Sequence, residues 1–260
     1  MNIDILASKQ LLAAIITSAF VGGIAGYIGS LMVTKRMSLM GGALGHLTLP
    51  GIALALVYGI DVSIGALLFL IFGIILIWAI EKRTKLPTES VTAIVFSSSV
   101  AIALLFLKHE EIDIAIIGDI SKITFYTATV TAVISIAIFF IVRFILRYIV
   151  LASISEDLAA VEGANVLLYK FIYLACIACV VALGVRIVGG LMTAALVAIP
   201  ACTSKNISKN LYGYTYFSLL VGATSCALGV FAAYITKLPT GPMIIICSSL
   251  FFIFSLVLKK

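Results

Sequence analysis

The sequence predicts an all-α membrane protein, a polytopic bundle of eight to nine transmembrane helices. Three observations support this fold class. The 260-residue chain is 63% apolar and only 11% charged, whereas soluble domains are about 45–50% apolar. Its charges, 17 Lys and Arg with 11 Asp and Glu, are too few to cover a soluble fold of this size. The remaining observation is that long stretches contain no charge at all, which also excludes a disordered chain.

Nine stretches without charged residues are candidate membrane spans. A helix needs about 20 apolar residues to cross the hydrocarbon core, and it satisfies its own backbone groups inside lipid. The stretches are 10–34, 37–60, 62–80, 90–107, 123–142, 171–185, 187–204, 210–236 and 238–258. The pair that meets at Arg186 is marginal, and its second member runs into Pro200. Either of these two is expected to be a short, broken or re-entrant helix, and eight crossings remain if one fails to cross.

The basic residues fall unevenly on the two sides of the membrane. With nine crossings, 12 of the 17 Lys and Arg residues lie on one side and 5 on the other. The positive-inside rule places the richer side and the carboxyl terminus in the cytoplasm. Because these residues are scattered rather than massed in a patch, nucleic-acid binding is not expected. No long linker divides the chain, so residues 1–260 are predicted to be a single transmembrane domain.

His46 is the only histidine in a predicted span. If that span begins near Met37, His46 lies about 14 Å into the membrane, close to the midplane. Gly42 and Gly45 share its helical face and leave space beside the imidazole, and Pro50 disrupts the helix that follows. Neutral imidazole is a common ligand of zinc, manganese and iron. Two interpretations stay open: a metal ligand on a transport pathway, or a histidine bonded to a neighbouring helix in a glycine-rich packing face.

A second candidate site is the acidic segment at about 153–166, on the predicted cytoplasmic side. Ser153 and Glu156 form a capping box, and Gly163 suits the position after a helix end, so a helix of about two turns is predicted. Leu158 and Val161 give this helix an apolar edge. Its acids would be repelled by anionic headgroups, which favours docking on a soluble partner over a helix that rests on the bilayer. The candidate coupling residues are Ser153, Glu156, Asp157, Leu158, Val161, Glu162 and Gly163.

No sequence motif in this chain indicates catalysis. The sequence contains no G-x-x-x-x-G-K-[ST] phosphate loop, no Ser/His/Asp set and no H-E-x-x-H. An energised pump made of this chain alone is therefore not expected, and neither are an enzyme or a bound cofactor.

Short motifs along the whole chain resemble the permease subunit of bacterial ABC importers for zinc, manganese or iron. The segment from Arg36-Met37-Ser38 to His46, followed by Leu49-Pro50-Gly51, is similar to the family's arginine–methionine–serine stretch and its aspartate-x-x-x-histidine motif. Further matches are Phe96-Ser97-Ser98, Gly118-Asp119-Ile120, Asp157-Leu158-Ala159 with Glu162-Gly163, Val188-Gly189-Gly190-Leu191, Ile199-Pro200-Ala201 and Thr240-Gly241-Pro242. Their order and spacing make the resemblance specific for the family.

The resemblance implies a multi-pass protein of the bacterial cytoplasmic (inner) membrane that works as a homodimer. It also implies a cytoplasmic ATP-binding subunit docked at about 153–166 and an extracytoplasmic metal-binding protein. Zinc, manganese or iron would then be cargo rather than a cofactor. The family's motif has an aspartate four residues before the histidine, where this chain has Gly42. His46 is therefore left as the single ligand on this stretch, and Glu89 and Asp119 are the candidates to lend an acid.

The alternative is a secondary carrier or channel that works without ATP. Such proteins normally use acidic residues inside the membrane for proton or sodium coupling. The predicted spans contain almost no such residue, which favours the ABC permease.

Overall fold

The computed structural model describes residues 2–34, 44–84, 86, 88–106, 123–155, 159, 161–163, 165–190 and 192–258. In these ranges the regular structure is helical, as predicted. The helices are α1 (Asn2–Thr34), α3 (Leu49–Tyr58), α4 (Val62–Thr84), α5 (Thr88–Phe106), α7 (Phe125–Ile154), α9 (Val166–Val188), α10 (Thr193–Ile207), α11 (Leu211–Thr236) and α12 (Thr240–Val257). These helices follow the charge-free stretches in order, although α9 also includes the first two residues of 187–204. Among the described residues, six helices are long and apolar enough to cross a membrane, and shorter apolar helices occupy 44–55 and 90–103.

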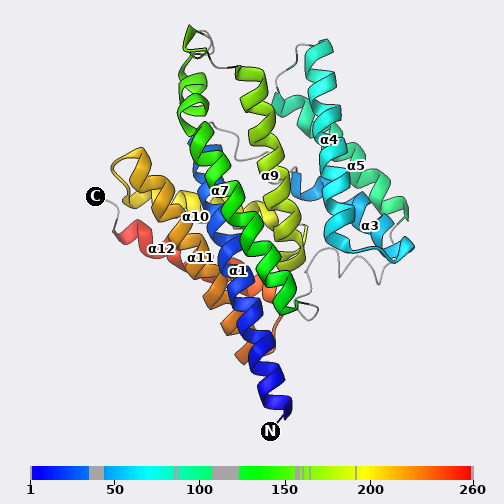
Figure 1. Ribbon diagram of the computed structural model, residues 1–260, viewed down its shortest axis with the longest axis vertical. Coiled ribbons are helices and arrows are strands. Elements are labelled where there is room, and N and C mark those ends of the chain that lie inside the picture. Colours follow the sequence, from blue (N-terminus) through cyan, green and yellow to red (C-terminus); the bar gives the residue numbers. More distant parts are fainter. Residues whose placement is uncertain are drawn as a thin grey trace.

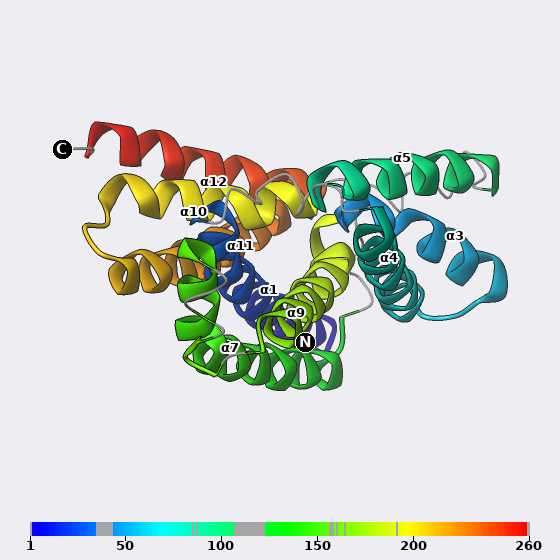
Figure 2. The same cartoon turned by 90° about the horizontal axis from the view of Figure 1, so that it is seen from above.

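The helices form three neighbouring groups (Figure 1). In the central group α1 and α7 begin at the same end of the bundle, and α9 runs in the opposite direction. The central group is α1, α7 and α9, with α10, α11 and α12 on one side and α3, α4 and α5 on the other (Figure 2). α1 packs on α7, α9, α10 and α11. In the third group, α3 and α5 pack on α4 and on each other, and α4 packs on α9. α9 therefore joins the α3–α5 group to the rest of the bundle.

The crossing of α1 and α11 is close because α1 carries glycine where the two backbones meet. A Cβ atom on Gly22 would lie on the carbonyl oxygen of Gly222, and one on Gly26 would lie on the carbonyl oxygen of Ser218. Gly22 and Gly26 are one turn apart on one face of the helix. Small residues at this spacing let membrane helices pack backbone to backbone, because van der Waals contact rather than hydrophobic burial drives their association in lipid.

α7 does not end at Arg143, the charge that closes the predicted span 123–142. It continues through Arg143 and Arg147 to Ile154, and its 30 residues span about 45 Å, which exceeds the hydrocarbon thickness of about 30 Å. The helix begins at a capping box in which Thr124 and Thr127 bond reciprocally. The guanidinium of Arg143 lies within 6.0 Å of the centres of the Tyr212 and Tyr216 rings. Aromatic faces thus accommodate the charge of Arg143, and the helix is long enough to extend beyond the hydrocarbon core.

The two marginal predicted spans, 171–185 and 187–204, are separated at a later residue than Arg186, where the sequence places the break. The stretch 171–185 lies inside α9, a full-length helix of 23 residues that contains Arg186 in its last turn. The break comes at Gly189, whose φ of 86° ends the helix. The short member is α10, with 15 residues and Pro200 inside it. Arg186 does not break the helix because a charge at a helix end costs no backbone hydrogen bond, whereas a positive φ does.

Candidate functional site

His46 lies in a single helical turn, 44–47, that precedes α3. Its imidazole is half-buried and packs on the ring of Phe96 from α5, with ring centroids 4.9 Å apart and the planes tilted by 38°. The helix is interrupted at Thr48, whose N–H donates to the carbonyl of Gly45 at 3.3 Å. Pro50 has no N–H to donate to the carbonyl of His46. The predicted disruption of the helix after the histidine is therefore confirmed.

The glycine before the histidine holds this turn against α10. A Cβ atom on Gly45 would lie on the side-chain oxygen of Thr193 and close to the carbonyl oxygen of Gly190. The Thr193 hydroxyl itself donates to that carbonyl at 2.9 Å. Part of the predicted space beside the histidine is thus taken by the start of α10. His46 consequently lies where three parts of the chain meet: its own turn, α5 and the 190–193 connection.

The structure places the other candidate metal ligands as follows. Glu89 is in the first turn of α5, and Phe96, seven residues later, is on the same helical face about 10 Å along the axis. Asp119 lies outside the described residues, as does Gly42. Among the residues that the structure describes, no group of three or more His, Cys, Asp or Glu side chains is close enough to hold a metal ion. The described part of this site is therefore a single imidazole against an aromatic ring.

The acidic segment begins two residues later than predicted. Ser153 belongs to the last turn of α7, and Ser155 instead has the extended backbone, with φ −156° and ψ 126°, that suits a cap. The carbonyl of Ser155 accepts from the N–H of Ala159 at 3.3 Å, the first bond of a new turn. The capping-box prediction for Ser153 is wrong because α7, extended by its well-solvated arginines, runs through that position. Glu156, Asp157 and Leu158 lie outside the described residues.

The far end of the segment agrees with the sequence prediction. Gly163 has a φ of 78°, the left-handed conformation predicted for the residue after the helix. Ala159 is completely buried, whereas Val161 is 86% exposed. The carboxylate of Glu162 accepts from the guanidinium of Arg147 on α7 at 2.6 Å. The segment is thus seated on the bundle through Ala159, tied to α7 by an ion pair, and presents an apolar side chain outward.

Two ion pairs that sequence reasoning missed connect α9 to the α3–α5 group. At one end, Lys170 pairs with Glu81 of α4 at 2.7 Å, with both side chains about one-third exposed or less. At the other end, Arg186 lies 3.7 Å from Asp61, the residue just before α4. The partners of the first pair are 89 positions apart in the sequence. Neither pair follows from local spacing, so only the fold reveals them.

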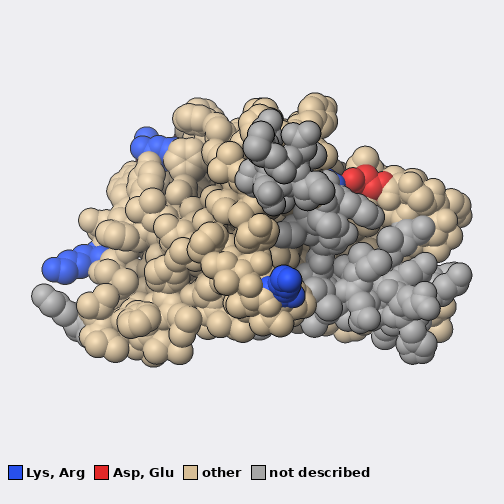
Figure 3. Space-filling view, turned by 90° about the horizontal axis from the view of Figure 1, so that it is seen from below, with Lys and Arg blue, Asp and Glu red and all other residues tan. Residues whose placement is uncertain are grey.

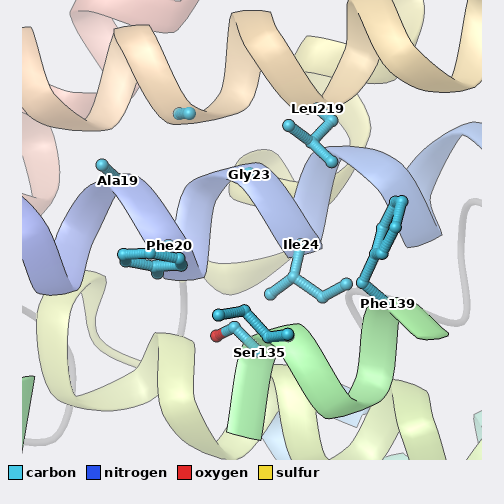
Figure 4. Close-up of a pocket in the computed structure, with 9 residues that line it drawn as sticks. Ala19, Phe20, Gly23, Ile24, Ser135, Phe139 and Leu219 are labelled. Atoms are coloured by element: carbon cyan, nitrogen blue, oxygen red, sulfur yellow. The ribbon is translucent and has the colours of Figure 1, made fainter. Parts of the chain in front are cut away.

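The groove between α1, α7 and α11 is lined almost entirely by apolar side chains. It has a volume of about 220 Å³, and its apolar lining includes Phe20, Ile24, Phe139 and Leu219 (Figure 4). Ser135 is its polar member among the described lining residues. Such a groove offers van der Waals contact and no charge or metal ligand. The candidate site therefore remains at His46 and Phe96.

Among the described residues, few charged side chains lie at the end of the bundle at which α1 and α7 begin. In the part of this end that the structure describes, Figure 3 shows isolated Lys and Arg side chains and one place where an acidic side chain reaches the surface. Arg186, Asp61 and Lys237 lie in helix ends and turns at this end. This is the side that the charge count places outside the cell, and its orientation in the membrane stays a prediction.

Comparison with known proteins gives a match over nearly the whole chain. The family model described as the ABC 3 transport family matches residues 7–259. The manganese import system permease protein ScaB of Streptococcus parasanguinis is 26% identical over 246 residues, which cover 93% of this chain and 88% of that protein. The high-affinity zinc uptake system membrane protein ZnuB of Buchnera aphidicola is 26% identical over 241 residues, covering 90% and 92%. A chain in the structure of PsaBC from Streptococcus pneumoniae in complex with Fab superposes with a TM-score of 0.82 at 26% identity, covering 98% and 95%.

Proposed function

Because the chain belongs to the ABC 3 transport family, whose relatives are permease subunits of manganese and zinc ABC transporters, we propose that it imports a divalent transition-metal ion into the bacterial cytoplasm. The cargo is manganese, zinc or iron. The observation that carries this proposal is the match of the family model over residues 7–259. The names of the streptococcal and Buchnera relatives, a manganese import permease and a zinc uptake protein, support the class of cargo.

The energy for transport comes, in this proposal, from a separate ATP-binding subunit on the cytoplasmic face. The segment between α7 and α9 is its docking site. Exposed Val161 supplies an apolar contact, and the ion pair of Glu162 with Arg147 fixes the segment to the end of α7. Two copies of the permease and an extracytoplasmic metal-binding protein complete the transporter. ATP-driven closure of the two ATP-binding subunits would then move the segment and switch the helices between two packed states.

His46 is the proposed ligand on the metal pathway. A neutral imidazole has a lone pair suited to zinc, manganese and iron. The ring is half-buried, so one side of it remains accessible, and Phe96 holds its orientation. A single ligand binds a passing ion weakly, which suits a pathway that must release its cargo.

Metal uptake by the complete transporter tests this function. The permease, its ATP-binding subunit and its binding protein are reconstituted into vesicles, and accumulation of manganese, zinc and iron is measured with and without ATP. We expect ATP-dependent uptake by the wild type and a loss of about tenfold or more in His46→Ala, comparable to the loss of affinity when a metal site loses a supporting group. Phe96→Leu removes the ring that packs on the imidazole but keeps an apolar contact, and we expect it to reduce uptake less than His46→Ala does.

Two results would contradict the proposal. Uphill accumulation by the permease alone, without the ATP-binding subunit or ATP, would favour the secondary carrier. Wild-type uptake by His46→Ala would remove the imidazole from the pathway and leave the family assignment intact.

A further inference from the structure

A second groove runs along α9 between α4 and α7. Both of these helices pack on α9, and within the described helices they do not pack on each other. α9 therefore forms the floor of the groove, and α4 and α7 form its two walls (Figure 1). The cavity has a volume of about 300 Å³. In Figure 2, α7, one wall of the groove, lies along the edge of the molecule opposite α5, the helix that carries Phe96.

The lining of this groove carries its charged group at one end and is mainly apolar elsewhere, with Thr17 and Thr131 as further polar members. Ser63, Tyr126 and Arg186 line the end where α4 and α7 begin and α9 finishes. Leu67 and Ile134 line the deeper part. Ile134 is eight residues beyond Tyr126 on α7, which corresponds to about 12 Å along the helix axis. The groove is therefore amphipathic in the direction of the membrane normal, with its polar end at a helix terminus.

The groove is open on the side that faces the bilayer. Several of its lining side chains are exposed there, Tyr126 by 78%, Ile64 by 52% and Val130 by 39%. At this depth the surroundings are acyl chains rather than water. Arg186 lies in the last turn of α9, at the level where a spanning helix leaves the hydrocarbon and meets the headgroups. A molecule with an apolar chain and an anionic head matches both ends of the groove.

We propose that this groove binds one phospholipid, with the lipid phosphate on the guanidinium of Arg186 and an acyl chain along α9 between α4 and α7. Arginine presents a planar fork of N–H donors that fits phosphate oxygens. The guanidinium has five N–H donors in all, so the same side chain binds a phosphate while it stays 3.7 Å from Asp61. The hydroxyls of Ser63 and Tyr126 at the same end are further donors for headgroup oxygens.

Four variants of the full-length chain test this site. Val130→Trp fills the groove, and Val133→Trp is its matched control, because Val133 is on the same helix, is 61% exposed and does not line the cavity. Arg186→Gln removes the phosphate ligand. Asp61→Asn breaks the same ion pair but keeps the guanidinium, and therefore separates lipid binding from the pairing of α9 with the α3–α4 turn.

The purified, delipidated chain is titrated with dioleoyl phosphatidylglycerol, and bound lipids are counted by native mass spectrometry. We expect Val130→Trp and Arg186→Gln each to weaken the tightest-bound lipid about tenfold, the size expected for loss of a charged hydrogen bond, while Val133→Trp and Asp61→Asn bind it as the wild type does. Inorganic phosphate alone is expected not to compete, because it lacks the chain that fills the groove. Gel filtration and thermal unfolding confirm that each variant is folded.

Unchanged affinity in Val130→Trp or in Arg186→Gln overturns the proposal. Equal losses in Arg186→Gln and Asp61→Asn would assign the effect to the ion pair instead of the phosphate, and equal losses in both tryptophan variants would assign it to the lipid-facing surface of α7 in general. None of these readouts depends on metal transport, so failure of the lipid site and failure of the proposed function are distinguishable.

Discussion

The ion pair between Arg147 and Glu162 allows two roles of the acidic segment to be separated. Glu162 either positions the segment by binding α7 or contacts the ATP-binding subunit directly. Glu162→Arg removes the pair and places two positive charges together. The double variant Arg147→Glu with Glu162→Arg restores an ion pair at the same place with its polarity reversed. If the role of Glu162 is to position the segment, the double variant regains what the single variant loses.

The free energy that the ion pair contributes is limited by the solvent exposure of its two side chains. The side chain of Arg147 is 74% exposed and that of Glu162 is 46% exposed, although their charged atoms are 2.6 Å apart. An exposed pair of this kind contributes about 0.2–1 kcal/mol, and the new repulsion in Glu162→Arg adds a similar amount. The docked form of the segment is therefore destabilised by roughly 1–2 kcal/mol at most, which lowers the ratio of docked to released segment by up to about thirtyfold. A larger loss of transport would require a contact beyond this chain.

The assay is metal uptake into vesicles with and without ATP, run beside ATP hydrolysis by the proposed ATP-binding subunit. We expect Glu162→Arg to reduce both and the double variant to restore most of each. Raising the salt concentration is expected to shrink the difference between variants, because exposed pairs are screened. A double variant as impaired as Glu162→Arg would refute the positioning role and place Glu162 in the contact with the ATP-binding subunit.

Two further predictions concern packing. Gly26→Ala puts a Cβ on the carbonyl oxygen of Ser218, so α1 and α11 must separate, and we expect a loss of about 1–3 kcal/mol in unfolding free energy. Gly23→Ala is the control on the same helix, and it is expected to be neutral or stabilising because its Cβ would make only ordinary contacts of 3.4 Å or more. Thermal unfolding in detergent compares the two variants. In Gly45→Ala the new Cβ meets the side-chain oxygen of Thr193 in the same way. Because the change displaces the turn that carries His46, the proposed pathway ligand, we expect metal uptake to fall along with stability. Equal uptake and stability in wild type and variant would show that this contact is not tight.

The sequence predicts the helices well because placing a charged side chain in lipid costs free energy, so the spans are free of charge. Each of the nine charge-free stretches corresponds to a helix of the described structure. The ends of the helices are less predictable, because arginine and lysine reach water from within a helix. α7 therefore passes through Arg143 and Arg147, and α9 begins before Lys170. The misplaced cap at Ser153 is a consequence of the same extension of α7.

The candidate site is predictable only in part. A histidine alone among apolar residues marks His46 from the sequence, and the glycine beside it signals a close contact. The partner in that contact, Thr193, and the ring that orients the imidazole, Phe96, come from distant parts of the chain. The sequence does carry a signal for the close crossing of α1 with another helix, because Gly22 and Gly26 have the small-xxx-small spacing of packed membrane helices. The ion pairs of α9 carry no such signal, since their partners are brought together by the fold.

The placement of α9 explains how movement at the cytoplasmic segment would reach His46. α9 starts at the cap formed by Asn165, three positions after Glu162. Its pairs with Glu81 and Asp61 hold it to α4 near both of its ends, and separating either pair would remove a favourable interaction between opposite charges. α9 and the α3–α5 group are therefore expected to move together as one body. The turn of His46 touches that body through Phe96 and touches α10 through Gly45. We infer that the histidine lies at the joint between two moving parts, where a change in their relative position would open or close access to the imidazole.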